Sequence, residues 1–143
     1  MSGIIGQIGS NSGFVEQAVK KHQYKTAALS NSWDGWAPQG NTSHEDGVTV
    51  QNMGRVWIMA ISIEKGSISA GTSGYEVIVN IASEFTMPNG IVTLGCGHFG
   101  QSSENDYSSL IELHTSGNVY LYYNNGSANS MQVHSNFIGL DIS

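Results

Sequence analysis

Cysteine, proline and long apolar runs are scarce in this sequence. Its 143 residues include one cysteine, Cys96, and two prolines. An intrachain disulfide is therefore excluded, and stability must come from packing or from assembly. No run of about 18 apolar residues is present, which argues against a membrane-spanning helix. No basic segment precedes an apolar run at the N-terminus, as a signal peptide would require. We therefore expect a chain that is made in the cytoplasm and does not insert into a membrane.

Charged residues are also scarce, at 11% of the chain, and five Lys and Arg stand against eleven Asp and Glu, for a net charge of −6. Binding along a nucleic-acid backbone or an anionic membrane is therefore disfavoured. Glycine, in contrast, occurs 18 times, and hydroxyl and amide side chains are abundant. This composition is typical of a compact all-β protein with many turns, and the length suits one domain.

The segment from Gly54 to Glu64 predicts a central strand. Side chains alternate across a strand, and here one row is apolar while the opposite row is partly apolar too. A strand that is apolar on both faces needs cover on both sides. The first row comprises Trp57, Met59, Ile61 and Ile63, and the second comprises Val56, Ile58 and Ala60.

Short strands separated by turn residues continue to the end of the chain. Residues 75–83 alternate, and Thr115-Ser-Gly-Asn118 and Asn124-Asn-Gly126 each predict a hairpin turn. Further strands are expected at 48–50, 91–99, 110–114, 119–123, 132–134 and 137–142. This pattern predicts an all-β fold, an antiparallel, jelly-roll-like β-sandwich formed by residues 26–143.

Residues 1–13 carry no charge and place apolar side chains among glycines. A floppy terminus is one interpretation. We favour an extended anchor peptide, because such a backbone can lie close against a partner protein. The expected anchor residues are Gly3, Ile4, Ile5, Gly6, Ile8 and Gly9.

A short helix is expected over residues 14–25. Ser12 can cap it, Glu16 lies in its first turn, and lysines lie toward its C-terminal end, as the helix dipole favours. Its apolar stripe can pack on the chain's own sandwich or on copies of itself around an axis, as in a trimeric stalk. The stripe comprises Phe14, Val15, Ala18, Val19 and His22, the expected oligomer interface.

Aromatic and amide side chains give the candidate ligand-binding residues. Trp33 and Trp36 lie in a polar stretch and are either plugs at the end of the sandwich, which we favour, or a platform for a sugar ring. Tyr120, Tyr122 and Tyr123 lie beside residues rich in Asn and Ser, and aromatic faces with amide donors suit saccharides. The alternative is that one of these tyrosines is core and the others flank a subunit interface. The ligand candidates are Trp33, Trp36, Tyr120, Tyr122, Asn124 and Asn125.

Catalysis receives little support from the sequence. Two carboxylate pairs, Glu45 with Asp46 and Glu104 with Asp106, suit a solvated surface better than a glycosidase, which needs a set separation between two carboxyl groups. Cys96 and His98 share one face of an expected strand but offer only two metal ligands. We therefore expect a non-enzymatic protein without a cofactor or a metal.

Several short motifs resemble the β-sandwich head domains at the tips of phage tail appendages. They are LSNSW (29–33), VQNMGRV (50–56), FTMP (85–88), SGNVYL (116–121) and FIGLDI (137–142). The likeness covers roughly residues 29–143. Separately, SGIIG (2–6) followed by GSNSG (9–13) resembles the N-terminal tag of many virion proteins of marine phages.

This resemblance implies a virion protein of the tail tip or tail fibre that attaches to the host surface. It further implies a homotrimer, contact with other virion proteins through the N-terminus, and a host saccharide as ligand. The alternative is a decoration or head-fibre protein that the same peptide binds to the capsid. A free lectin-like module is a third, weaker hypothesis.

Overall fold

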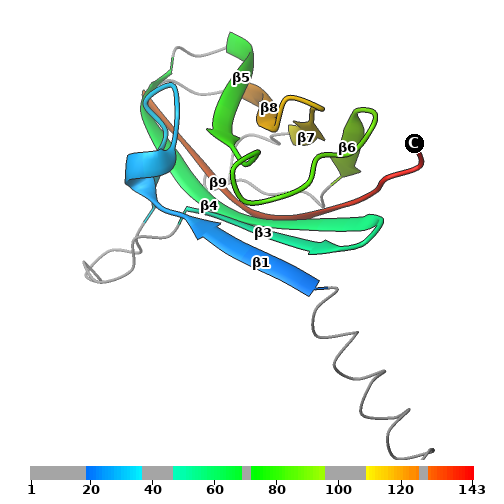
Figure 1. The fold of residues 1–143 in the computed structure, drawn as a ribbon. Helices are drawn as coiled ribbons and strands as arrows, with labels where there is room; N and C mark the ends of the chain where they lie inside the picture. Colours follow the sequence, from blue (N-terminus) through cyan, green and yellow to red (C-terminus); the bar gives the residue numbers. More distant parts are fainter. Residues whose placement is uncertain (1–18, 37–46, 69–71, 96–108, 126–128) are drawn as a thin grey trace, which may run out of the picture.

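The computed structural model describes residues 19–36, 47–68, 72–95, 109–125 and 129–143 (Figure 1). These residues form nine β-strands and one 3-10 turn, and no α-helix occurs among them. The prediction of an all-β fold is therefore confirmed. The elements are β1 (Val19–Tyr24), η1 (Thr26–Ala28), β2 (Asp34–Gly35), β3 (Val48–Met53), β4 (Val56–Ile68), β5 (Thr72–Asn80), β6 (Val92–Gly95), β7 (Ser109–Leu113), β8 (Asn118–Asn125) and β9 (Asn129–Leu140).

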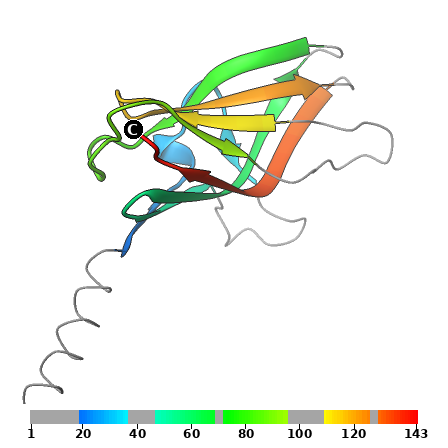
Figure 2. The same cartoon turned by 90° about the vertical axis from the view of Figure 1, so that its right-hand side faces the viewer.

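The strands form one antiparallel sheet in the order β1-β3-β4-β9-β6-β7-β8-β5, with β2 paired to β4. The sheet curls so that its first half, β1-β3-β4-β9, faces its second half, β6-β7-β8-β5 (Figures 1 and 2). In the part of the chain that the structure describes, β9 and β6 are joined by one residue pair, Ile138 with Gly95. Gly139 lies at this joint, where an added Cβ would be 2.7 Å from the Thr93 carbonyl oxygen.

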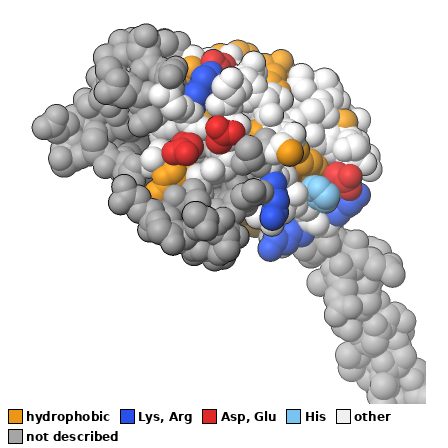
Figure 3. Space-filling model, turned by 90° about the vertical axis from the view of Figure 1, so that its left-hand side faces the viewer, with side chains coloured by type: hydrophobic (Ala, Val, Ile, Leu, Met, Phe, Trp, Pro, Cys, Tyr) orange, Lys and Arg blue, Asp and Glu red, His pale blue; other side chains and the backbone are white. Residues whose placement is uncertain are grey.

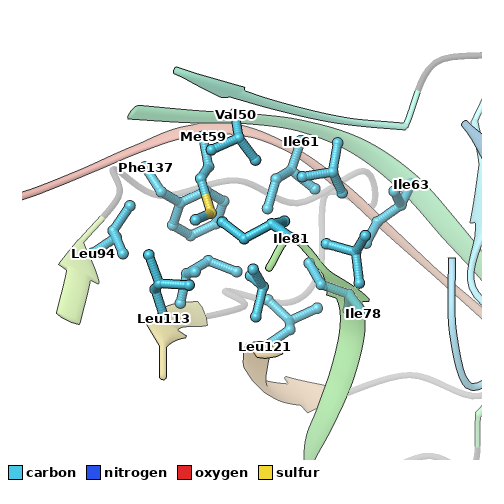
Figure 4. Close-up of a cluster of buried hydrophobic side chains, with 14 of the residues drawn as sticks. Val50, Met59, Ile61, Ile63, Ile78, Ile81, Leu94, Leu113, Leu121 and Phe137 are labelled. Atoms are coloured by element: carbon cyan, nitrogen blue, oxygen red, sulfur yellow. The ribbon is translucent and has the colours of Figure 1, made fainter. Parts of the chain in front are cut away.

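The buried side chains of both halves meet inside the curl. Because each strand alternates, one row from every long strand points inward. The largest fully buried side chains include Phe137 and Met59 from the first half and Ile78 and Leu121 from the second. Figure 4 shows these side chains pointing toward one another between the two halves. Burial of apolar area at this core is the main stabilising contribution expected for the fold.

β4 is the central strand of the first half, as the sequence predicted. It pairs with β3 on one side and β9 on the other. The row of Trp57, Met59, Ile61 and Ile63 is buried. The opposite row is not covered as expected, because Ala60 is exposed and Val56 and Ile58 are only half-buried.

The expected helix over 14–25 is wrong where the structure describes it. Residues 19–24 form β1, which pairs antiparallel with β3, and His22 lies opposite Val50. Sheet pairing competes with a marginal helix here because it buries the Tyr24 ring, which is 6% exposed, and pairs one side of the β1 backbone with β3. Two of the expected interface residues, Val19 and His22, are thus strand residues. Phe14, Val15, Ala18 and the anchor residues of 1–13 lie outside the described residues.

The inward-facing side chains of β1 contact the segment that follows β5. His22 Nδ1 lies 3.8 Å from a Glu84 carboxylate oxygen. Lys20 Nζ lies 5.4 Å from the centre of the Phe85 ring. Lys20, Lys21 and Lys25 are exposed, and Figure 3 shows basic side chains near the point where the described chain begins. Lysines on an edge strand also oppose pairing with another chain.

The edge strand β5 is partly covered by another segment of the chain. At β5, the edge carbonyl groups have partners from the segment after η1: Ser30 N donates to Ile78 O at 2.9 Å, and Asn31 Nδ2 donates to Val77 O at 2.8 Å. Asn31 has a φ of 56°, a left-handed conformation that asparagine tolerates better than most residues. This covered edge is therefore less open to strand addition than an unprotected one.

Two turn predictions have opposite outcomes. The Thr115–Asn118 hairpin is confirmed, because β7 and β8 pair directly and Gly117 takes a φ of 83° at the turn. The second hairpin, at Asn124-Asn-Gly126, is wrong. β8 pairs with β7 and β5, whereas β9 crosses to the other half and pairs with β4 and β6. The alternation expected for 75–83 also fails at a bulge after Val77, where both Ile78 and Val79 are buried.

Candidate functional site

A group of aromatic and polar side chains lies on the outer surface of the second half of the sheet. Tyr75 of β5 lies opposite Tyr122 of β8, and Tyr120 of β8 lies opposite Glu112 of β7. Side chains in these registers share one face. With His114, which follows β7, these five residues form what we call the tyrosine face. Tyr75 is 41% exposed and Tyr122 is 39% exposed, so the face is open to solvent.

The rings of the tyrosine face form a ladder. The Tyr75 ring packs against Tyr120 with centroids 4.4 Å apart and planes 12° apart, and against Tyr122 at 4.1 Å and 34°. The His114 ring lies 4.5 Å from the Tyr120 ring. Ring pairs at such distances stabilise one another beyond the area they bury. The ladder therefore fixes the rings, and the exposed parts of Tyr75 and Tyr122 are accessible to a ligand.

Polar atoms converge at one end of this ladder. The Tyr75 hydroxyl donates to Glu112 Oε2 at 3.1 Å and lies 3.0 Å from His114 Nε2. His114 Nε2 is 3.2 Å from the same carboxylate oxygen. Partial desolvation, followed by the Glu112 carboxylate, raises the pKa of the Tyr75 phenol above its ordinary value. At neutral pH the Tyr75 phenol is therefore neutral and can donate a hydrogen bond.

Of the ligand residues expected from sequence, Tyr120 and Tyr122 lie on the tyrosine face. Asn124 and Asn125 lie at the end of β8, where their backbones pair with Ser73 and Thr72. The alternative in which one of the three tyrosines is core is realised by Tyr123, which is 6% exposed.

Trp33 is a plug, the interpretation that the sequence favoured. Its ring is 1% exposed and meets the Tyr123 ring edge-on, with centroids 5.9 Å apart. Its Nε1 donates to Glu76 Oε2 at 3.0 Å. Lys65 Nζ lies 2.6 Å from that same oxygen and 5.6 Å from the centre of the Trp33 ring. Trp33 is thus held by a network inside the fold and cannot serve as a surface platform.

Trp36 lies on the outer surface of the first half. Its ring meets the His134 ring edge-on with centroids 4.0 Å apart, and its backbone N donates to Ser62 O at 3.1 Å. Ser62 Oγ and His134 Nδ1 share a hydrogen bond of 2.9 Å. Beside them is a groove of about 350 Å³, which we call the polar groove. Trp36 and the tyrosine face are therefore on different surfaces, and the structure does not bring the sequence-predicted ligand residues into one site.

Sequence analysis missed Tyr75, Glu112 and His114. The alternation of residues 75–83 placed Tyr75 on a strand face, but nothing in the sequence paired that strand with 118–125. β5 and β8 are about 40 residues apart in the chain, and their register decides that Tyr75 meets Tyr122. The spacing of Glu112 and His114, two apart at the end of a strand, was the available signal that they share a face.

The residues considered for chemistry lie outside the described residues: Glu45, Asp46, Cys96, His98, Glu104 and Asp106. Within the described ranges, no three His, Cys, Asp or Glu side chains are grouped as a metal site would require. No helix in those ranges is long and apolar enough to cross a membrane. Comparison with protein-family models, curated proteins and solved structures found no match to this chain.

Proposed function

We propose that this chain is a non-enzymatic phage virion protein whose head attaches to a saccharide on the host surface through the tyrosine face. The observation that carries the saccharide proposal is the exposed row of Tyr75, Tyr120 and Tyr122 beside Glu112. Tyrosine supplies apolar area with a polar tip, and a carboxylate accepts hydrogen bonds from sugar hydroxyl groups. The virion assignment is supported by the resemblance of the short motifs to tail-appendage heads.

The proposed architecture is a jelly-roll-like head in which the two halves of the curled sheet act as the two layers of a sandwich. The curl that sets the buried side chains of the two halves face to face supports this view (Figures 1 and 4). Residues 1–13 would serve as the peptide that binds other virion proteins. Deleting residues 2–13 is expected to abolish incorporation into particles while leaving the head folded. Incorporation of the deleted protein at the full level would contradict the anchor.

Exposed apolar side chains on β9 support homo-oligomerisation, with a trimer as the proposed state. Ile138 is 58% exposed and Leu140 is 56% exposed, and both lie on the outer face beside Ile58 and Val56 of β4. Contiguous exposed apolar side chains often mark an association surface. The mass of the protein in solution tests this: a trimer that Leu140→Lys converts to a monomer would support it. A monomer at every concentration would contradict it.

The saccharide proposal is tested by binding of the purified protein to host cells and to an array of host glycans. Tyr122→Ala should reduce binding at least tenfold, because it removes the solvent-facing end of the ladder. Met53→Ala is the matched control, since Met53 is also 39% exposed but lies on the other half of the sheet. Equal binding by both variants and the unmodified protein would contradict the tyrosine face as the attachment site.

Immunogold labelling of particles distinguishes the virion locations. Label at the tail tip supports the attachment proposal. Label confined to the capsid would overturn it in favour of a decoration or head-fibre protein held by the same N-terminal peptide.

A further inference from the structure

The polar groove lies on the outer surface of the first half of the sheet, away from the tyrosine face. Strands β1, β3, β4 and β9 each contribute to its lining. Its volume of about 350 Å³ falls within the range of small-ligand sites, roughly 300 to 1,000 Å³. The outward side chains that line it are Gln23, Thr49, Ala60, Ser62, His134 and Asn136.

The chemistry of this lining is neutral. Among the described residues that line the groove, none is Asp, Glu, Lys or Arg. Its polar groups are hydroxyls, primary amides and one imidazole, and each of the amides offers both a donor and an acceptor. These described side chains offer no carboxylate, ammonium or guanidinium group to a charged ligand. A ligand that is itself neutral and rich in hydroxyl groups matches this lining.

Part of the lining is held in place by contacts within the fold. Ser62 Oγ and His134 Nδ1 are 2.9 Å apart. The backbone of Ser62 is fixed from two sides: its N donates to Gly47 O at 2.8 Å and its O accepts from Trp36 N at 3.1 Å. The Trp36 ring supports the His134 ring at 4.0 Å. Groups held in this way lose little freedom when a ligand binds.

The lining also contains one exposed apolar side chain, that of Ala60. Ala60 is the exposed residue of β4 between Ile58 and Ser62, and it lies opposite Asn136 of β9. Its small side chain leaves room above the strand, with polar side chains on the neighbouring strands. A sugar ring has this same division, with an apolar C–H face and a rim of hydroxyl groups.

We propose that the polar groove is a second binding site, specific for a neutral saccharide unit. The inference is independent of attachment through the tyrosine face, because the two sites share no residue and lie on the outer surfaces of different halves. A chain with both sites would hold one glycan at two points or two glycans at once, which strengthens attachment by avidity.

The test is titration of the full chain with glucose, galactose and N-acetylglucosamine, followed by calorimetry and by NMR shifts of groove residues. Glucuronate serves as the charged counterpart of glucose. We expect at least one neutral sugar to saturate the groove and glucuronate to bind at least tenfold more weakly. Absence of binding by all three neutral sugars, or equal binding of glucuronate, would overturn the proposal.

Variants place the binding in the groove. Ala60→Trp should reduce affinity at least tenfold by filling the space, and Asn136→Ala should reduce it several-fold. Ala27→Trp is the matched control, because Ala27 is exposed on η1, away from the groove lining. Unchanged affinity in Ala60→Trp would overturn the proposal. Tyr122→Ala should leave groove binding unchanged, so failure of the groove and failure of the tyrosine face are measured separately.

Discussion

The ring of Tyr75 stacks on the ring of Tyr120, with centroids 4.4 Å apart and planes inclined by only 12°. These residues come from β5 and β8, and they are brought together by the register that sets Tyr75 opposite Tyr122. The ladder built on this stack is therefore a candidate ligand surface. Its ring contacts also hold the edge strand β5 against β8.

Replacing Tyr75 should separate the stabilising effect of its ring from that of its hydroxyl group. Tyr75→Ala removes ring contacts with both neighbours, each worth about 0.5 to 1.5 kcal/mol, and should lower the free energy of unfolding by about 1 to 3 kcal/mol. Tyr75→Phe keeps the stack and loses only the hydroxyl contacts to Glu112 and His114, so it should cost less than about 1 kcal/mol. Urea unfolding of the two variants measures the difference. Equal losses would show that stacking is not the stabilising contact.

The network at Glu76 should be sensitive to loss of one partner. Glu76 accepts from Trp33, Lys65 and Tyr123. Glu76→Gln leaves the largely covered Lys65 ammonium without its counter-charge and should lower the free energy of unfolding by about 2 to 3 kcal/mol. Glu112→Gln is the control, because the hydrogen-bond partners of Glu112 are Tyr75 and His114, so this change leaves no lysine ammonium without its counter-charge. It should cost about 1 kcal/mol or less.

Lys65→Met completes a double-mutant cycle with Glu76→Gln. If the two side chains are coupled as their 2.6 Å separation indicates, the double variant should lose less stability than the sum of the single losses, by about 1 kcal/mol or more. Simple additivity of the two losses would contradict the coupling.

Gly74 should not accept a side chain. An added Cβ would meet the ring of Tyr123, which is buried and donates a hydrogen bond to Glu76 through its hydroxyl. The ring cannot move without breaking this bond, so Gly74→Ala should lower the free energy of unfolding by about 1 to 3 kcal/mol. Gly66→Ala is the matched control, since nothing lies within 4 Å of its added Cβ. Thermal unfolding of the two variants measures the difference between their losses of stability.

Alkaline pH should weaken the fold partly through Tyr24. Burial, then the nearby Glu84 carboxylate, raises the pKa of Tyr24 to about 12 from its ordinary 10.0. The folded state therefore holds this proton more tightly. The stability that the raised pKa contributes is fully present below the pKa of the unfolded state. It is lost as the pH rises from 10 toward 12, at about 1.4 kcal/mol for each pKa unit. Across this range the unfolding free energy of the unmodified protein should fall relative to that of Tyr24→Phe, so the difference between the two should change with pH. A constant difference would contradict the shift.

The sequence predicted the parts of the fold that depend on local pattern. The buried row from Trp57 to Ile63 and the Gly117 turn follow from alternation and from a residue that accepts positive φ. The pairing of strands far apart in the chain did not follow. Asn124-Asn-Gly126 has the composition of a hairpin turn, yet the chain continues into the other half of the sheet, because β9 pairs with β4 along nearly its whole length.

The β1 error has a different physical origin. Lys20, His22 and Tyr24 form the inward row of this strand, and only the tyrosine is apolar, so the alternation expected of a strand was hidden. The inward polar residues are accommodated because they meet Glu84 and Phe85 at the rim instead of the core. Only part of the tyrosine face was predicted. Tyr120 and Tyr122 are close in sequence, whereas Tyr75 joins them only through the pairing of β5 with β8.

The pairing of β4 with β9 has a consequence for the order in which this protein can be assembled. Ile58 lies opposite Ile138, eighty positions later in the chain. While the ribosome is still translating residues 129–140, one long side of β4 has no partner, and the nascent chain carries an incomplete sheet. Contacts of such large sequence separation are associated with slow folding. The sheet should therefore close only after residues 129–140 have been synthesised, when β9 pairs with the β4 strand that was made earlier.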